Sequence, residues 1–121
     1  MESILTSIKK MLGIAEEYTH FDMDIIMHIN TVLGTLTQIG VGSSKGFSIQ
    51  DDSEIWSDFI PSNYNLEMIK SYVYLKVRLL FDPPQSSSVA TSMENTIKEL
   101  EWRISVTVDP GNVGEEESQN V

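Results

Sequence analysis

Two histidines and an aspartate recur at intervals of four residues in one stretch of the sequence. His20, Asp24 and His28 would share one face if a single helix ran through all three. Two imidazoles and a carboxylate can together bind a divalent metal ion. The residues around Asp22 predict instead that a helix begins there, which would leave His20 outside it and break the alignment. The pattern therefore indicates solvated polar side chains, and no catalytic, cofactor or metal site is predicted.

Other catalytic patterns are equally weak in this chain. It contains serine, histidine and aspartate but lacks the Gly-x-Ser-x-Gly turn of many serine hydrolases. The glycine-rich stretch 40–46 lacks the Gly-Lys-Ser/Thr ending of a phosphate loop and follows a predicted helix, not a strand. Paired carboxylates of the glycosidase kind are possible in any acidic chain, but helix caps and solvated faces are the simpler explanation of the acids. The chain is expected not to be an enzyme.

The composition excludes further classes of protein. The 121 residues form one expected domain and include no cysteine, which excludes disulfide frameworks, thiolate zinc sites, iron–sulfur clusters and cysteine nucleophiles. Eighteen acidic and eight basic residues give a net charge of −10, which disfavours proteins that clamp DNA phosphates. No apolar run reaches the roughly 18 residues of a membrane-spanning helix. The first ten residues also lack the order of a secretory signal.

Apolar residues at helical spacing predict two helices in the first third of the chain. The first is expected at about residues 3–12 and should stop at Gly13. The second is expected at about residues 22–39, with Asp22 as its N-cap and Gly40 as its terminator. Its predicted apolar stripe consists of Ile25, Ile29, Val32, Leu33, Leu36 and Ile39.

The middle of the chain is expected to be a loop followed by one short helix. Residues 40–52 are rich in turn-forming residues, and a small hairpin is one option within this loop. Asp51 and Glu54 resemble a capping box. They would open a helix of one or two turns that ends before Pro61.

Two longer helices are predicted in the second half of the chain. The helix at about residues 65–81 has an apolar arc wide enough to pack on two sides, so it should be the central element. The sequence Asp82-Pro83-Pro84 ends it, and serines at 86–88 can cap the last helix. The two predicted stripes are Leu66, Ile69, Val73, Val77 and Leu80, and then Val89, Met93, Ile97, Leu100 and Ile104.

These elements predict an all-α fold, a compact antiparallel bundle of four to five helices. Residues 1–108 would form this helical domain. Residues 109–121 include three consecutive glutamates among glycine, serine, glutamine and asparagine, so they are expected to be a flexible, disordered acidic tail.

Six residues are candidates for contact with partner proteins. Trp56 and Phe59 would either close the edge of the core, which is the preferred interpretation, or anchor a partner. Trp102 lies off the apolar stripe of its helix, which favours an interface position. Arg78 and two nearby lysines concentrate positive charge on one helix, which would suit complementary contacts between subunits. The full set of candidates is Trp56, Phe59, Trp102, Arg78, Phe47 and Val113.

Several segments resemble the head–tail connector, or adaptor, proteins of long-tailed bacteriophages. The resemblance covers about residues 3–110, and the order of helices in that family agrees with the order predicted above. The segments that carry it are the run at 72–84, the residues 99–103 of the last helix, the opening at 4–13, and the Phe47-x-Ile49-x-Asp51 loop before the helix that contains Trp56.

The resemblance implies a structural protein of the virion. Members of this family are small helical subunits that assemble as a ring, expected to be a dodecamer, beneath the portal. The ring extends the DNA channel and offers a docking surface to the tail. The implied partners are the portal protein, neighbouring copies, and the tail, stopper or tail-terminator protein, while genomic DNA passes through without specific binding and no membrane is involved.

The resemblance also implies a location and a role for the tail of the chain. The protein would reside at the head–tail interface of the virion after assembly in the cytoplasm of the host bacterium. Residues 109–121 would be the terminal extension that becomes ordered on the portal. The acidic excess would suit a channel wall along which DNA slides, because like charges repel the DNA backbone.

An alternative from a different class is an acidic helical binding module. Such a protein would mask a basic surface of its partner, as inhibitors that mimic DNA do. A DNA mimic needs carboxylates in a repeating pattern on its folded surface. Four of the eighteen acids here, Asp109 and Glu115–Glu117, lie instead in or at the expected tail. Several of the others suit helix caps, so the connector is the preferred function.

Overall fold

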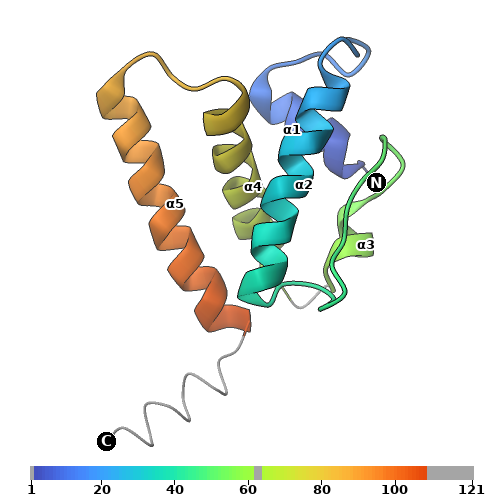
Figure 1. The fold of residues 1–121 in the computed structure, drawn as a ribbon, viewed down its shortest axis with the longest axis vertical. Coiled ribbons are helices and arrows are strands. Elements are labelled where there is room, and N and C mark those ends of the chain that lie inside the picture. Colours follow the sequence, from blue (N-terminus) through green and yellow to red (C-terminus); the bar gives the residue numbers. More distant parts are fainter. Residues whose placement is uncertain (1, 62–63, 109–121) are drawn as a thin grey trace, which may run out of the picture.

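The computed structural model describes residues 2–61 and 64–108, which form five α-helices and no β-strand (Figure 1). This confirms the predicted all-α fold and its compact packing of helix on helix. The predicted disordered tail at 109–121 lies outside the described residues, and the boundary of the helical domain at residue 108 stays a prediction. The helices are α1 (Ile4–Leu12), α2 (Asp22–Ile39), α3 (Trp56–Phe59), α4 (Leu66–Phe81) and α5 (Ser87–Val108).

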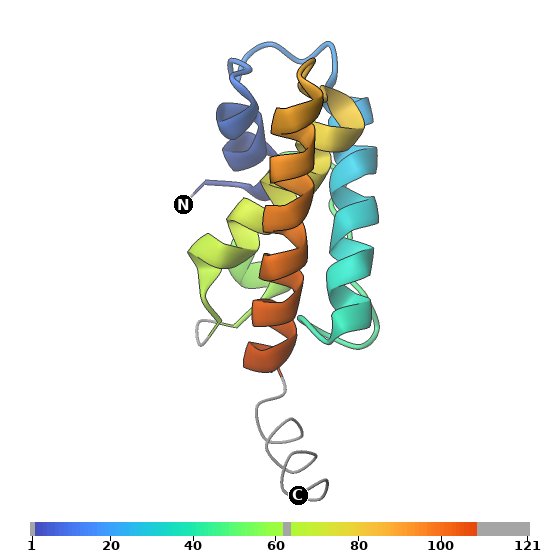
Figure 2. The ribbon, with the colours of Figure 1, turned by 90° about the vertical axis from the view of Figure 1, so that its left-hand side faces the viewer.

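Helix α4 is the central element, as its wide apolar arc predicts. It contacts α1, α2 and α5, and Figures 1 and 2 show it enclosed among them. Leu80 was expected on the buried stripe but is 50% exposed, and Val89 is 47% exposed. These two residues lie near the connection between α4 and α5, where the two helices diverge (Figure 1). The exposed ends therefore mark where the packing of α5 against α4 stops.

One apolar core joins all five helices. Every member of the predicted α2 stripe is buried except Ile39, which is half-buried. None of the described helices is both long and apolar enough to cross a membrane. The buried apolar side chains include Ile4, Leu5 and Ile8 of α1, Ile25, Ile29, Val32, Leu33 and Leu36 of α2, Trp56 and Phe59 of α3, Ile69, Tyr72, Val73 and Val77 of α4, and Ile97 and Ile104 of α5.

Local capping residues define the helix ends. Before α1, the Ser3 hydroxyl accepts the N–H of Thr6 at 3.0 Å, and Asn65 occupies the same position before α4. At the ends of α1 and α2, Gly13 and Gly40 adopt φ angles of 81° and 112°. Residues with a side chain rarely adopt such angles, so these glycines end their helices where the sequence predicted.

The predicted N-cap of α2 is wrong. Asp22 is the first residue of the helix, and Phe21 occupies the N-cap position without a side-chain hydrogen bond. The Asp22 carboxylate pairs instead with Lys9, with 2.8 Å between Oδ1 and Nζ. Lys9 is only 2% exposed. An unpaired ammonium group at this buried position would cost more free energy than a helix without a side-chain N-cap. His20 lies outside α2, as expected.

Lys9 also fixes the connection between α1 and α2. Its ammonium group donates hydrogen bonds to the carbonyl oxygens of Glu16, at 2.9 Å, and Tyr18, at 2.7 Å. The ion pair with Asp22 adds a counter-charge beside these two hydrogen bonds. A single buried lysine therefore holds this connection, together with Ile14, which packs against the core.

Residues 40–55 form a loop, and the optional hairpin is not among the described elements. Asn30 of α2 holds the loop through Ile49: the side-chain amide donates to the Ile49 carbonyl at 2.9 Å, and its oxygen accepts the Ile49 N–H at 2.7 Å. These bonds press Ile49 into the core, where it is 2% exposed.

The short helix α3 begins later than the capping box predicts. The Glu54 carboxylate accepts the backbone N–H of Gln50, at 2.9 Å, and so stabilises the loop rather than the helix. The cap comes from Asp58, whose carboxylate accepts the N–H of Ile55 at 2.9 Å. Helix α3 is consequently a single turn that begins at Trp56.

Candidate interaction surfaces

Trp56 joins α3 to α1 from inside the fold. Its indole N–H donates to the Ser7 hydroxyl at 2.9 Å, and that hydroxyl donates to the Ile4 carbonyl at 3.0 Å. Nearby, Ser3 and Ile55 form an isolated antiparallel bridge. Because Trp56 is 3% exposed and its N–H is satisfied, the structure supports its interpretation as part of the core edge.

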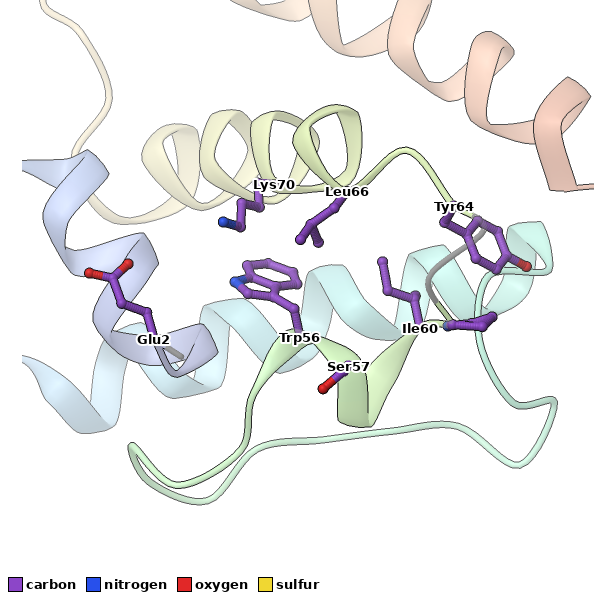
Figure 3. A pocket seen from close by; sticks show the side chains of 8 residues that line it. Glu2, Trp56, Ser57, Ile60, Tyr64, Leu66 and Lys70 are labelled. Carbon is purple, nitrogen blue, oxygen red and sulfur yellow. The ribbon is translucent and has the colours of Figure 1, made fainter.

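The outer side of Trp56 forms the wall of a pocket of about 290 Å³, which we call the α3 pocket (Figure 3). It lies between the start of the chain, α3 and the first turns of α4. Figure 3 shows Glu2 and Lys70 on the Trp56 side of the pocket and Tyr64 at the other side. The lining residues are Glu2, Trp56, Ser57, Ile60, Pro61, Tyr64, Leu66 and Lys70.

Charges of both signs stand at the Trp56 side of the α3 pocket. A hydrogen bond and ion pair with Lys10 lower the pKa of Glu2, and the charge of Lys70 lowers it further. Glu2 is therefore ionised at neutral pH. The pocket thus offers an apolar interior beside one carboxylate and one ammonium group, an arrangement that suits an amphipathic side chain better than a charged substrate.

Three other interface candidates lie within or against the fold. Phe59 is 4% exposed, and its ring centroid lies 5.3 Å from that of half-buried Phe47. Arg78 is half-buried; it donates to the Tyr74 hydroxyl at 3.3 Å and to the backbone carbonyl of Asp82, and so stabilises the end of α4. Val113 lies outside the described residues. Whether any of these residues contacts a partner stays a prediction.

Trp102 is different, because 68% of it is exposed on α5. It lies on the side of the helix away from Ile97 and Ile104, which are buried against the bundle. Beside it, Arg103 and Glu99 form an ion pair at 3.3 Å, and both are more than half exposed. A large exposed aromatic ring is a typical anchor for a protein partner.

Next to Trp102 in the sequence, Glu101 forms a polar contact between α5 and α4. This contact was not predicted from the sequence. The hydroxyl of fully buried Tyr72 donates to Glu101 at 2.7 Å, and Lys76 lies 3.8 Å from the same carboxylate. Burial, and then the bond to Glu101, raises the pKa of Tyr72. The available signal was spacing, since Glu101 lies four residues after Ile97 on the inward face of its helix.

A second exposed apolar surface lies at the start of α2. Met23 is 76% exposed and Met27 is 58% exposed. Their exposure could be inferred from the sequence, because neither belongs to the predicted apolar stripe of α2. Nearby, the rings of Phe21 and Phe81 pack with 5.4 Å between their centroids. A hollow of about 390 Å³ beside them is lined by Leu12, Ile14, Tyr18, Phe21, Phe81 and Asp82.

His20 and His28 both lie near aromatic rings. The ring of exposed His20 is 4.8 Å from that of Phe21, and the ring of His28 is 6.4 Å from that of Phe81. Within residues 2–61 and 64–108, no three side chains of the metal-binding types come together.

The comparison with protein families gives one match. A family model described as phage connector protein matches residues 4–111, a range that includes all five described helices. Searches of the curated proteins and of the solved structures found no significant match.

Proposed function

The chain belongs to the phage connector protein family, and we propose that it is a head–tail connector that assembles as a ring beneath the portal. The match over residues 4–111 carries this proposal, because it spans the whole helical domain. The role is structural and not enzymatic. The ring would extend the DNA channel within the virion and offer a docking surface to the tail, stopper or tail-terminator protein.

The exposed surfaces support assembly with copies of the same chain. A ring subunit needs two different side surfaces, because rotational symmetry brings the front of one copy against the back of the next. The monomer carries Trp102 on α5, the α3 pocket on another face, and an apolar surface around Met23 at the start of α2. Two of these three surfaces could contact the neighbouring copies, and the third could contact a portal or tail protein.

The charge of the chain supports the channel role. A net charge of −10 would give a ring of many copies a strongly negative surface. DNA passing such a wall gains no affinity from counterion release, so it can slide. We expect the acidic residues to gather on the surface that faces the channel, and a ring with a basic channel would contradict this part of the proposal.

Residues 109–121 are the proposed contact with the portal. Their sequence offers Val113 as an apolar anchor followed by Glu115–Glu117 as a charged segment. In the full-length protein, Val113→Asp should weaken binding to the portal and leave the helical content unchanged. Val121→Asp is the matched control at the other valine of the segment.

Electron microscopy with the portal protein tests the proposal. The purified chain should scatter light as a monomer when alone and should form rings on the portal in negative stain. Closed rings without a portal would contradict portal-dependent assembly. A monomer that does not bind the portal protein but binds a nuclease or repressor would overturn the connector proposal. That result would support the alternative of an acidic inhibitor that mimics DNA.

A further inference from the structure

We propose that neighbouring copies meet when Trp102 of one copy enters the α3 pocket of the next. This deepens the proposed ring assembly and rests on it for its biological setting. The contact itself depends only on two features of the chain, an exposed aromatic side chain and an apolar pocket on different faces.

The size and lining of the α3 pocket suit an indole ring. Its volume of about 290 Å³ is just below the roughly 300 Å³ at which the range for ligand pockets begins, which suits one large side chain. Tyr64 supplies an accessible aromatic surface and Leu66 and Pro61 supply apolar ones, while the buried Trp56 closes one end of the pocket. Ser57 also lines the pocket, from α3.

The charges around the two partners are complementary. Trp102 is flanked by exposed Glu99 and Arg103, while the pocket has Lys70 and Glu2 at its side. Placing Glu99 near Lys70 would bring opposite charges of the two copies together, while Glu2 keeps its ion pair with Lys10. Such an arrangement fixes the orientation of the ring as it enters and disfavours the reversed one.

The positions of the two features make the contact head-to-tail. Figure 3 shows α5 on the far side of α4 from the pocket, and Trp102 lies on the outward side of α5. A contact between two copies would therefore leave one Trp102 and one pocket open for further copies. Repeating the same contact gives a closed ring when the rotation between copies closes, and an open filament when it does not.

Cysteine cross-linking tests the contact directly, because the native chain has no cysteine. One variant carries Glu99→Cys beside Trp102, and the other carries Lys70→Cys beside the pocket. The two are mixed and oxidised, with and without the purified portal protein. We expect a disulfide-linked dimer of the two variants, and neither variant alone should give one.

Two controls make the result specific. Adding Trp102→Ala to the Glu99→Cys variant should reduce the cross-link at least tenfold, because the anchor is lost while the exposed position tolerates the change. Ser92→Cys, an exposed position on the same helix, should cross-link with Lys70→Cys no better than the Trp102→Ala variant does. Equal yields in all three mixtures, or a Glu99→Cys variant that links mainly to itself, would overturn the proposal.

Co-sedimentation of the same mixtures with the portal separates the two levels of the proposal. Portal binding without the specific cross-link would refute the Trp102 contact and leave the connector function standing. The specific cross-link without portal binding would support the contact and count against the connector function.

Discussion

Buried Lys9 is the clearest case of one residue fixing a connection. Lys9→Met would remove the partner of the Asp22 carboxylate and of two carbonyl oxygens. We expect the free energy of unfolding to fall by about 2 to 4 kcal/mol, because a partly buried charge would be left without its counter-charge. Urea unfolding followed by circular dichroism measures the change.

The neighbouring Lys10 provides the control for this prediction. Its side chain is 57% exposed and pairs with Glu2 on the surface. Lys10→Met should therefore lower the free energy of unfolding far less than Lys9→Met does, because solvent screens an exposed ion pair. Equal effects of the two substitutions would show that Lys9 does not carry the connection between α1 and α2.

The raised pKa of Tyr72 predicts that the free energy of unfolding decreases at alkaline pH. The pKa of Tyr72 is raised in the folded chain, so the unfolded chain loses its proton first, above about pH 10. The stability from the neutral hydroxyl is thus complete below that pH and is lost as the pH rises further. Tyr72→Phe should cost about 1 to 2 kcal/mol at neutral pH and make the alkaline loss less steep.

Unfolding at a series of pH values between neutral and alkaline conditions measures this effect. Tyr18→Phe is the matched control, since Tyr18 is 50% exposed. Identical alkaline slopes for the native chain and the Tyr72→Phe variant would contradict the role of the bond to Glu101.

At the scale of helices, Gly40 joins the end of α2 to the end of α5. A Cβ atom there would lie 2.8 Å from Cγ1 of Val108, and the φ angle of 112° is unfavourable for any side chain. Gly40→Ala should therefore destabilise the fold by at least about 1 kcal/mol. Gly34→Ala within α2 meets nothing within 4 Å and should stabilise it by up to about 1 kcal/mol.

Thermal unfolding of the two alanine variants checks this pair. The midpoint should fall for Gly40→Ala and rise for Gly34→Ala. A rise for both would mean that neither the backbone angle nor the contact with Val108 constrains the end of α2.

The positions of the helices could be predicted because their signals are local. Apolar spacing and the glycines at 13 and 40 lie within the segments that they define. Asp22 was misassigned because its partner, Lys9, lies in another helix. The same reason hid the bond between Tyr72 and Glu101, whose residues are 29 positions apart.

The interaction surfaces could be predicted only in part. Trp102 was expected at an interface because it lies off the apolar stripe of its own helix, and it is indeed exposed. The α3 pocket combines residues from the chain start, α3 and α4, and only the folded arrangement brings Glu2 and Lys70 beside Trp56. Single positions are therefore readable from the sequence, whereas a pocket shared by several elements is not.

At the scale of the whole molecule, the fold combines one apolar core with several exposed apolar side chains. Its core is formed by all five described helices, so the exposed features can change without unfolding the chain. Trp102→Ala should accordingly leave the unfolding midpoint within about 2 °C of the native value, since substitutions at exposed positions change stability little. A large fall in the midpoint would place Trp102 within the core instead of at an interface.

The central claim is that this chain joins phage heads to tails, and complementation of virus particles tests it most directly. Particles produced without the chain should appear in the electron microscope as heads and free tails that are not joined. Addition of the purified chain should produce joined, infectious particles. Particles that join and infect normally in its absence would contradict the connector function.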